Sequence, residues 1–184
     1  MWGLIYAAAF IAAFALSVTV KMTTDPFGGK YKAHWDDTVG TVHTDLAYGE
    51  GASNKFDLYI PADSSRESYG LVVYLHAGGF TSGDKSGDAE MLQWLCARGY
   101  VVAGINYTLF SEENPQANVY TQSVEIRESI PVVVAEAAKL GYSIDRMAVA
   151  GGSAGHALAL LYAYRNADQS PVLVKMTFGA VGPS

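Results

Sequence analysis

Apolar residues after the first twenty positions fall into short runs typical of strands. The segment 55–61, KFDLYIP, alternates apolar and polar positions as a half-buried strand does. Two continuous runs rich in Val and Ile, at 71–76 and 101–107, are typical of central strands covered on both faces. We expect a further strand at 147–151 and a last strand near 172–178.

Helical patterns separate these strands. One helix is expected at 86–98, with Ser86 as its N-cap. A second is expected from about 119 to 140, with Pro131 breaking or kinking its middle. A third should span 154–165. The alternation of strands and helices predicts a three-layer α/β domain with a mostly parallel sheet.

The first 20 residues carry no charged side chain, and a helix of this length rises about 30 Å, the thickness of a bilayer's hydrocarbon core. The first positive side chain is Lys21, which favours a retained anchor, because a signal peptide normally has its positive charges before the apolar run. The triplet 13–15, AFA, nevertheless has the small-x-small form of a cleavage site, and a buried helix is the third alternative. We expect a transmembrane anchor or signal peptide at 1–20, a linker at 21–44 and the domain at 45–184.

The two membrane alternatives place the domain differently. Positive charges after a retained span favour the cytoplasmic side for the domain, whereas a signal peptide exports it. The sequence therefore predicts a membrane-anchored protein, or a secreted one if the segment is cleaved, and both orientations stay open.

Composition and charge exclude several classes of protein. The 184 residues are 50% hydrophobic and 16% charged, too apolar for a disordered tail. The net charge is −6, and the 12 basic residues form no block, which predicts no nucleic-acid partner. Cys96 is the single cysteine and cannot form an internal disulfide. No Cys/His cluster has zinc-site spacing, so no metal is expected.

The pentapeptide GGSAG at 151–155 stands between a predicted strand and a predicted helix, the context in which a GxSxG match is informative. Gly151 and Gly155 permit a sharp turn that presents Ser153 at the end of the strand. Free amides and the helix dipole can stabilise negative charge there. The alternative is a glycine-rich turn in which Ser153 only caps the helix.

A second glycine-rich loop, HAGGF at 76–80, follows the strand at 71–76. Glycine has no Cβ, so its backbone N–H groups can approach a developing oxyanion closely. The amide of Ala154, together with those of Gly78 and Gly79, would complete an oxyanion hole. The alternative is a tight turn that merely needs positive φ.

On these motifs the chain resembles the α/β-hydrolase superfamily, in its esterase/lipase branch with an HGGG-type loop, over about residues 45–184. The resemblance implies that Ser153 is the nucleophile and that a small-molecule ester is the substrate, with no cofactor. It implies an oxyanion hole of three backbone amides, those of Gly78, Gly79 and Ala154. It assigns His76 and Phe80 to support of the loop, and His76 is not the base.

The chain departs from the family pattern in three ways. Ala77 replaces the first glycine of the loop, and His156 stands where a small residue is usual, as a packing or pocket-lining residue. In this fold the acid and then the histidine follow the serine. The sole acid after Ser153 is Asp168, which has the character of a solvated loop residue.

The chain therefore lacks the acid and histidine of the triad, and we expect it to be the N-terminal portion of a hydrolase, ending before the last strands of the sheet. Such a portion should be nearly inactive alone. Two alternatives remain: a membrane-tethered noncatalytic domain that uses the hydrolase scaffold for binding, and a serine peptidase of the same fold.

Overall fold

A computed structural model describes residues 2–23 and 32–181 of the chain. The chain divides into two compact units, the first ending at Lys32 and the second beginning at Ala33. The first unit contains the helix α1 (Trp2–Thr23), whose segment Gly3–Val20 has a mean hydropathy of 2.1 and is not buried within the protein. In the described ranges it is the one helix long and apolar enough to cross a membrane. The expected N-terminal hydrophobic helix is therefore present.

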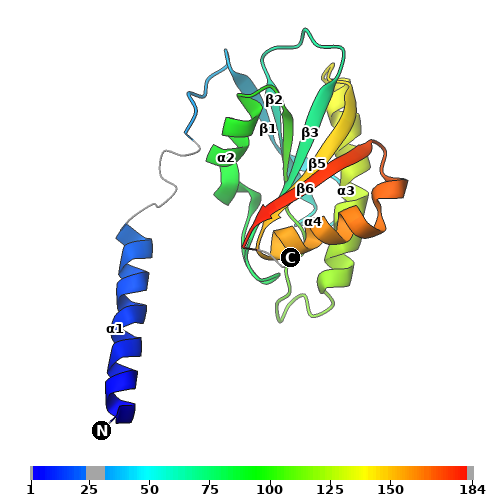
Figure 1. The fold of residues 1–184 in the computed structure, drawn as a ribbon. Helices are drawn as coiled ribbons and strands as arrows, with labels where there is room; N and C mark the ends of the chain where they lie inside the picture. The colour runs from blue at the N-terminus through cyan, green and yellow to red at the C-terminus, as the bar shows by residue number, and fades with distance from the viewer. Residues whose placement is uncertain (1, 24–31, 182–184) are drawn as a thin grey trace. The chain divides into compact units, whose positions relative to one another are not determined.

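The second unit is built on a six-stranded mixed sheet with the order β1-β2-β4-β3-β5-β6 (Figure 1). β1 and β2 pair antiparallel, as do β2 and β4, whereas β4, β3, β5 and β6 run parallel. This confirms the predicted α/β class with a mostly parallel sheet. The strands are β1 (Gly40–Ala47), β2 (Lys55–Pro61), β3 (Tyr69–Leu75), β4 (Val101–Ile105), β5 (Ile144–Gly152) and β6 (Leu173–Ala180).

Helices cover both faces of the sheet and make three layers. They are α2 (Ala89–Cys96), α3 (Val119–Lys139) and α4 (Ala154–Arg165), with short 3₁₀ turns η1 (Lys85–Asp88) and η2 (Ala167–Gln169). The larger buried cluster joins the sheet to α3 and α4, for example through Ile130 and Leu158. A smaller cluster joins the other face to α2 through Leu92 and Cys96.

The strand β1 lies partly within the segment 21–44 that was predicted to be a linker. Its residues are mostly exposed at the sheet edge, so the strand has no apolar run to reveal it. The pairing of β1 with β2 shifts between His43 and Leu46, where Asp45 has a φ of 56°. Residues 24–31 of the predicted linker lie outside the described residues.

Two local predictions about helices need correction. Pro131 does not break α3, which continues to Lys139, and the neighbouring side chains Ile130 and Val133 are fully buried, so packing holds both halves. Ser86 is not the N-cap of the helix after β3. Asp84 caps η1 instead, and its side chain accepts a hydrogen bond from the Ser86 amide.

Burial shifts the pKa of one carboxyl group at the start of α2. It raises the pKa of Asp88 to about 6, because the charged form loses hydration. An unfolded chain releases that proton at lower pH, so the free energy of unfolding should fall as pH rises toward 6. Asp88→Asn should therefore be more stable than the wild type at about pH 8, and the difference should shrink at about pH 4. Urea unfolding at the two pH values checks this, with the exposed Glu90→Gln as the control.

Candidate active site

Ser153 occupies a strained turn between β5 and α4. Its φ of 48° and ψ of −111° lie in a region that residues with a side chain rarely adopt. The Ser153 amide donates to the carbonyl of Ala180 (2.9 Å), and the Ser153 carbonyl accepts from the amide of Ala157 (3.1 Å). β6 and α4 therefore hold the turn from two sides.

Two glycines make this turn possible. A Cβ at Gly155 would lie 2.0 Å from the carbonyl oxygen of Leu75, and one at Gly151 would lie 2.4 Å from the carbonyl carbon of Gly155. No side chain fits in either place. The first turn of α4 thus packs directly on the end of β3.

The loop after β3 lies beside this turn. β3 and β5 are parallel neighbours with Leu75 opposite Gly151, so both segments leave the same edge of the sheet. A Cβ at Gly152 would lie 3.3 Å from the Cβ of Ala77. The methyl group of Ala77, which replaces the usual glycine, is therefore accommodated against Gly152.

Gly78 and Gly79 both have positive φ, at 137° and 61°. The Gly78 carbonyl accepts hydrogen bonds from the amides of Thr81 (3.1 Å) and Ser82 (3.0 Å), which closes a tight turn. A Cβ at Gly78 would lie 1.9 Å from the carbonyl oxygen of Ser82. Within residues 32–181, the amides of Gly78, Gly79 and Ala154 donate to no protein acceptor. They are available to a negatively charged oxygen.

His76 is packed under the loop. It is 2% exposed, and its ring stacks on Tyr107 with centroids 4.4 Å apart. The Tyr107 hydroxyl donates to the His76 carbonyl (2.9 Å), and His76 Nδ1 lies 2.8 Å from the Ala77 carbonyl oxygen. Burial lowers the pKa of His76, which favours the neutral ring. These contacts favour the predicted role in loop support.

Phe80 holds the far end of the same loop. It has a φ of 68°, and its side chain packs against the larger core cluster. Its carbonyl accepts from the Phe110 amide and from the Gln122 side-chain amide, each at 3.0 Å. Phe80 therefore connects the loop to the start of α3.

A buried ionic cluster lies just after the loop and was not predicted from the sequence. Lys85 is 7% exposed, and its Nζ lies 2.8 Å from Asp45 Oδ1 and 3.0 Å from Asp57 Oδ1. The Asp45 amide also donates to Asp57 Oδ1 (2.9 Å). Burial lowers the pKa of Lys85, but hydrogen bonds to Asp45 and Asp57 outweigh burial and raise it overall. Lys85 therefore remains charged and ties the loop to β1 and β2.

The backbone around Lys85 is fixed by a second set of hydrogen bonds. Its amide donates to Asn106 Oδ1 (2.7 Å), and Asn106 Nδ2 donates to Asp84 Oδ2 (2.6 Å). Burial raises the pKa of Asp84, but hydrogen bonds from Ser86 and Asn106 prevail and bring it to about 2. The end of the loop is thus anchored to the residue that follows β4.

The remaining candidates do not complete a triad. His156 packs on β6, where a Cβ at Gly179 would lie 2.4 Å from its ring, and its Nδ1 is buried without a hydrogen-bond partner in the described chain. Asp168 is exposed in η2. Across residues 32–181, no histidine hydrogen-bonds the Ser153 hydroxyl, and no three His, Cys, Asp or Glu side chains gather as a metal site.

One family model covers both the strained serine and the glycine-rich loop. The family model BD-FAE matches residues 56–178. The chain belongs to the BD-FAE family. Its BD-FAE segment runs from β2 to β6 and includes both the loop after β3 and Ser153.

Similar proteins are hydrolases. The chain is 31% identical to kynurenine formamidase of Salmo salar over 63% of this chain and 36% of that protein. It is 29% identical to the probable carboxylic ester hydrolase LipM of Mycobacterium tuberculosis, over 65% of this chain and 27% of that protein. Both relatives are therefore much longer than the part that this BD-FAE chain spans.

Solved esterase structures share the fold. Esterase B of Lactobacillus rhamnosis superimposes with a TM-score of 0.66 at 19% identity, over 99% of this chain and 59% of that one. The hyperthermophilic esterase of Pyrobaculum calidifontis superimposes with a TM-score of 0.61 at 27% identity, over 74% of this chain and 43% of that one. The BD-FAE chain is thus a carboxylic-ester-hydrolase-like member of the α/β-hydrolase fold.

Proposed function

We propose that this chain carries the nucleophile and the oxyanion hole of a serine hydrolase that acts on carboxylic esters. The observation that carries the proposal is the strained Ser153 turn beside the unpaired amides of Gly78 and Gly79. The arrangement suits a carbonyl carbon at the serine and its oxygen among the amides. The names of the similar proteins, which include several esterases, support the same chemistry.

In the proposed reaction, Ser153 Oγ attacks the ester carbonyl and loses its proton to a base. The carbonyl oxygen becomes negative and accepts hydrogen bonds from the backbone amides of Gly78, Gly79 and Ala154. The ester C–O bond then breaks, and the alcohol leaves with a proton. Water attacks the acyl-enzyme in the same way, which releases the acid and restores the serine hydroxyl.

We propose that the base and its acid partner belong to residues outside this sequence. His156 is packed on β6, and Asp168 is exposed at the far end of α4, so neither is placed to act on Ser153. Oxyanion stabilisation and binding alone leave about 10³–10⁴-fold catalysis over water. The 184-residue chain should show no more than that.

An ester assay tests both parts of the proposal. We expect slow hydrolysis of p-nitrophenyl butyrate by the chain, part of which survives Ser153→Ala because the oxyanion hole and binding remain. Slow acylation of the protein, followed by mass spectrometry, should be lost in Ser153→Ala and unchanged in the exposed control Ser143→Ala. Turnover at about 10 s⁻¹, typical of complete enzymes, would show that the chain contains its own base. A wild-type chain that forms no acyl adduct, or a Ser153→Ala chain that forms the same adduct, would exclude Ser153 as the nucleophile and favour a noncatalytic binding domain.

A second candidate substrate class is the amide. Two similar proteins, from Salmo salar and Danio rerio, are named kynurenine formamidase. The same serine and oxyanion hole serve acyl transfer from nitrogen, as they would in a peptidase. Rates on p-nitrophenyl formate and on formanilide separate the two classes. In a site that favours amides, the ratio of the anilide rate to the ester rate should be higher than the same ratio for hydrolysis by hydroxide in solution.

We also propose that α1 is a retained membrane anchor. Its segment Gly3–Val20 is apolar and long enough to span the hydrocarbon core. After expression in cells, the full-length chain should stay in the membrane pellet through alkaline carbonate extraction. A soluble chain whose N-terminus lies just after the 13–15 triplet would identify a cleaved signal peptide instead.

A further inference from the structure

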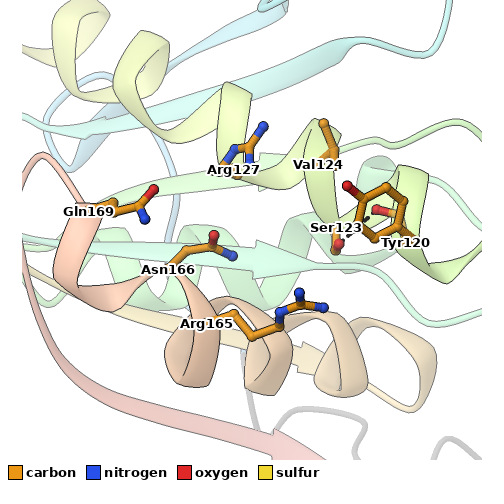
Figure 2. Close-up of a pocket in the computed structure, with 7 residues that line it drawn as sticks. All are labelled: Tyr120, Ser123, Val124, Arg127, Arg165, Asn166 and Gln169. Atoms are coloured by element: carbon orange, nitrogen blue, oxygen red, sulfur yellow. Dashed lines mark hydrogen bonds between the residues drawn. The ribbon is translucent and has the colours of Figure 1, made fainter.

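A hollow of about 220 Å³ lies between α3 and the end of α4, away from Ser153. From α3 it is lined by Tyr120, Ser123 and Arg127, and from α4 and η2 by Arg165, Asn166 and Gln169 (Figure 2). Ser153 precedes the first residue of α4 and Arg165 is the last. A helix of 12 residues is about 18 Å long, so the hollow is separate from the candidate active site.

Positive charge dominates this hollow. Its lining contains two guanidinium groups and no carboxylate. In the described part of the chain, Arg127 has one ion pair, at 3.7 Å with the exposed Glu128. Among the described residues, Arg165 has no ion pair. Two arginines with so little compensation are unexpected in a chain of net charge −6, and together they attract an anion.

Arg165 lies in the last turn of α4, where the negative end of the helix dipole attracts a cation. That attraction places a cation at a helix C-terminus but does not explain a second arginine, on α3, in the lining of the same hollow. Figure 2 shows Asn166 between the two arginines, its side-chain amide directed toward the hollow. The site therefore combines charged and neutral hydrogen-bond donors from two elements.

The number of donors indicates which anion fits. Two guanidiniums and the side-chain amides of Asn166 and Gln169 offer N–H groups from two elements, and the three terminal oxygens of a phosphate accept from more of them at once than the two oxygens of a carboxylate do. A cavity of about 150 Å³ holds benzene, so this one has room for a phosphate and a small organic group. Tyr120 is 65% exposed and offers that group an apolar ring face at the rim. We propose that the hollow is a binding site for a phosphate monoester.

The test uses the full chain in neutral detergent, with ¹⁵N-labelled arginine and NMR detection of the Nε–H groups. Phenyl phosphate should shift the Arg127 and Arg165 signals saturably. Arg127→Gln and Arg165→Gln should each weaken binding about tenfold, as expected for loss of a charge-assisted hydrogen bond. Both side chains are exposed, so the variants should keep the fold, which a circular dichroism spectrum verifies.

The matched control is Arg146→Gln, which removes the same charge from an exposed site paired with Asp145 on β5. It should leave phenyl phosphate binding unchanged. Equal weakening in this control, or equal affinity for benzoate and phenyl phosphate, would reduce the effect to general attraction of anions and overturn the proposal. If phenyl phosphate shifts neither arginine signal, the hollow does not bind a soluble phosphate monoester, and the lipid experiment below decides the proposal.

A further arm identifies that source. The labelled chain is placed in phosphatidylcholine bicelles with or without phosphatidic acid, whose headgroup is also a phosphate monoester. Shifts at both arginines only with phosphatidic acid would assign the site to a lipid headgroup, and shifts only with phenyl phosphate would assign it to a soluble ligand. Either result supports the proposal. Unchanged arginine signals with both phenyl phosphate and phosphatidic acid would refute it. Neither arm depends on Ser153, so the outcome is independent of the proposed hydrolase activity.

Discussion

Replacement of Lys85 with Met is expected to lower the free energy of unfolding by about 3–5 kcal/mol. The variant removes the ammonium group that lies 3.0 Å from the carboxylate of Asp57, which is 5% exposed. Among the described residues, the Asp45 amide would then be the one remaining hydrogen-bond donor to the buried Asp57 carboxylate. Urea unfolding followed by circular dichroism measures the loss.

Two further variants separate the buried partner from the exposed one. Asp45→Asn should cost less than about 1 kcal/mol, because the side chain of Asp45 is 72% exposed and water replaces the ion pair. Lys85→Met combined with Asp57→Asn should recover part of the stability, since the double variant leaves no buried charge unpaired. A cost below about 1 kcal/mol for Lys85→Met alone would mean that the cluster does not hold the loop.

Gly155→Ala should destabilise the chain by about 3 kcal/mol, at the upper end of the usual cost of overpacking. Helix propensity alone predicts the opposite, because Ala is favoured over Gly inside a helix by about 1 kcal/mol. Here the added Cβ would meet the Leu75 and His76 carbonyl oxygens at 2.0 and 2.6 Å, and these are backbone atoms that cannot rotate away. The sign of the change therefore tests the packing of α4 on the end of β3.

The matched control is Gly87→Ala in η1. A Cβ at Gly87 would meet no atom within 4 Å. This variant should change the free energy of unfolding by less than about 1 kcal/mol in the same urea experiment. A Gly155→Ala chain as stable as the wild type would contradict the close contact at the turn.

Much of the fold can be predicted from apolar runs. The continuous patterns of β3 and β4 and the boundaries of α4 were predicted because buried central strands and a glycine-flanked helix have strong local signals. β1 was missed because its residues are mostly exposed at the edge of the sheet. The order of the strands also has no local signal, since it depends on contacts between segments far apart in the chain.

The same distinction holds for the site. GxSxG and the glycine-rich loop are contiguous motifs, so Ser153 and its neighbouring amides are found from sequence. The Lys85–Asp57 ion pair joins η1 to β2, two segments far apart in the chain. Gly104 of β4 pairs with Asp57, and a Cβ at Gly104 would lie 3.5 Å from the Cβ of Lys85. One signal was present: Asp57 is a charged residue inside an otherwise apolar strand, and such a residue needs a buried partner.

Covalent labelling of Ser153 tests the central claim most directly. A p-nitrophenyl alkylphosphonate places a phosphoryl oxygen where the oxyanion would form, and peptide mass spectrometry locates the adduct. We expect the folded chain to react slowly and selectively at Ser153, with no adduct in Ser153→Ala and an unchanged adduct in Ser143→Ala. A folded chain in which Ser153 stays unmodified, or reacts no faster than its other serines, would contradict the assignment of Ser153 as the nucleophile.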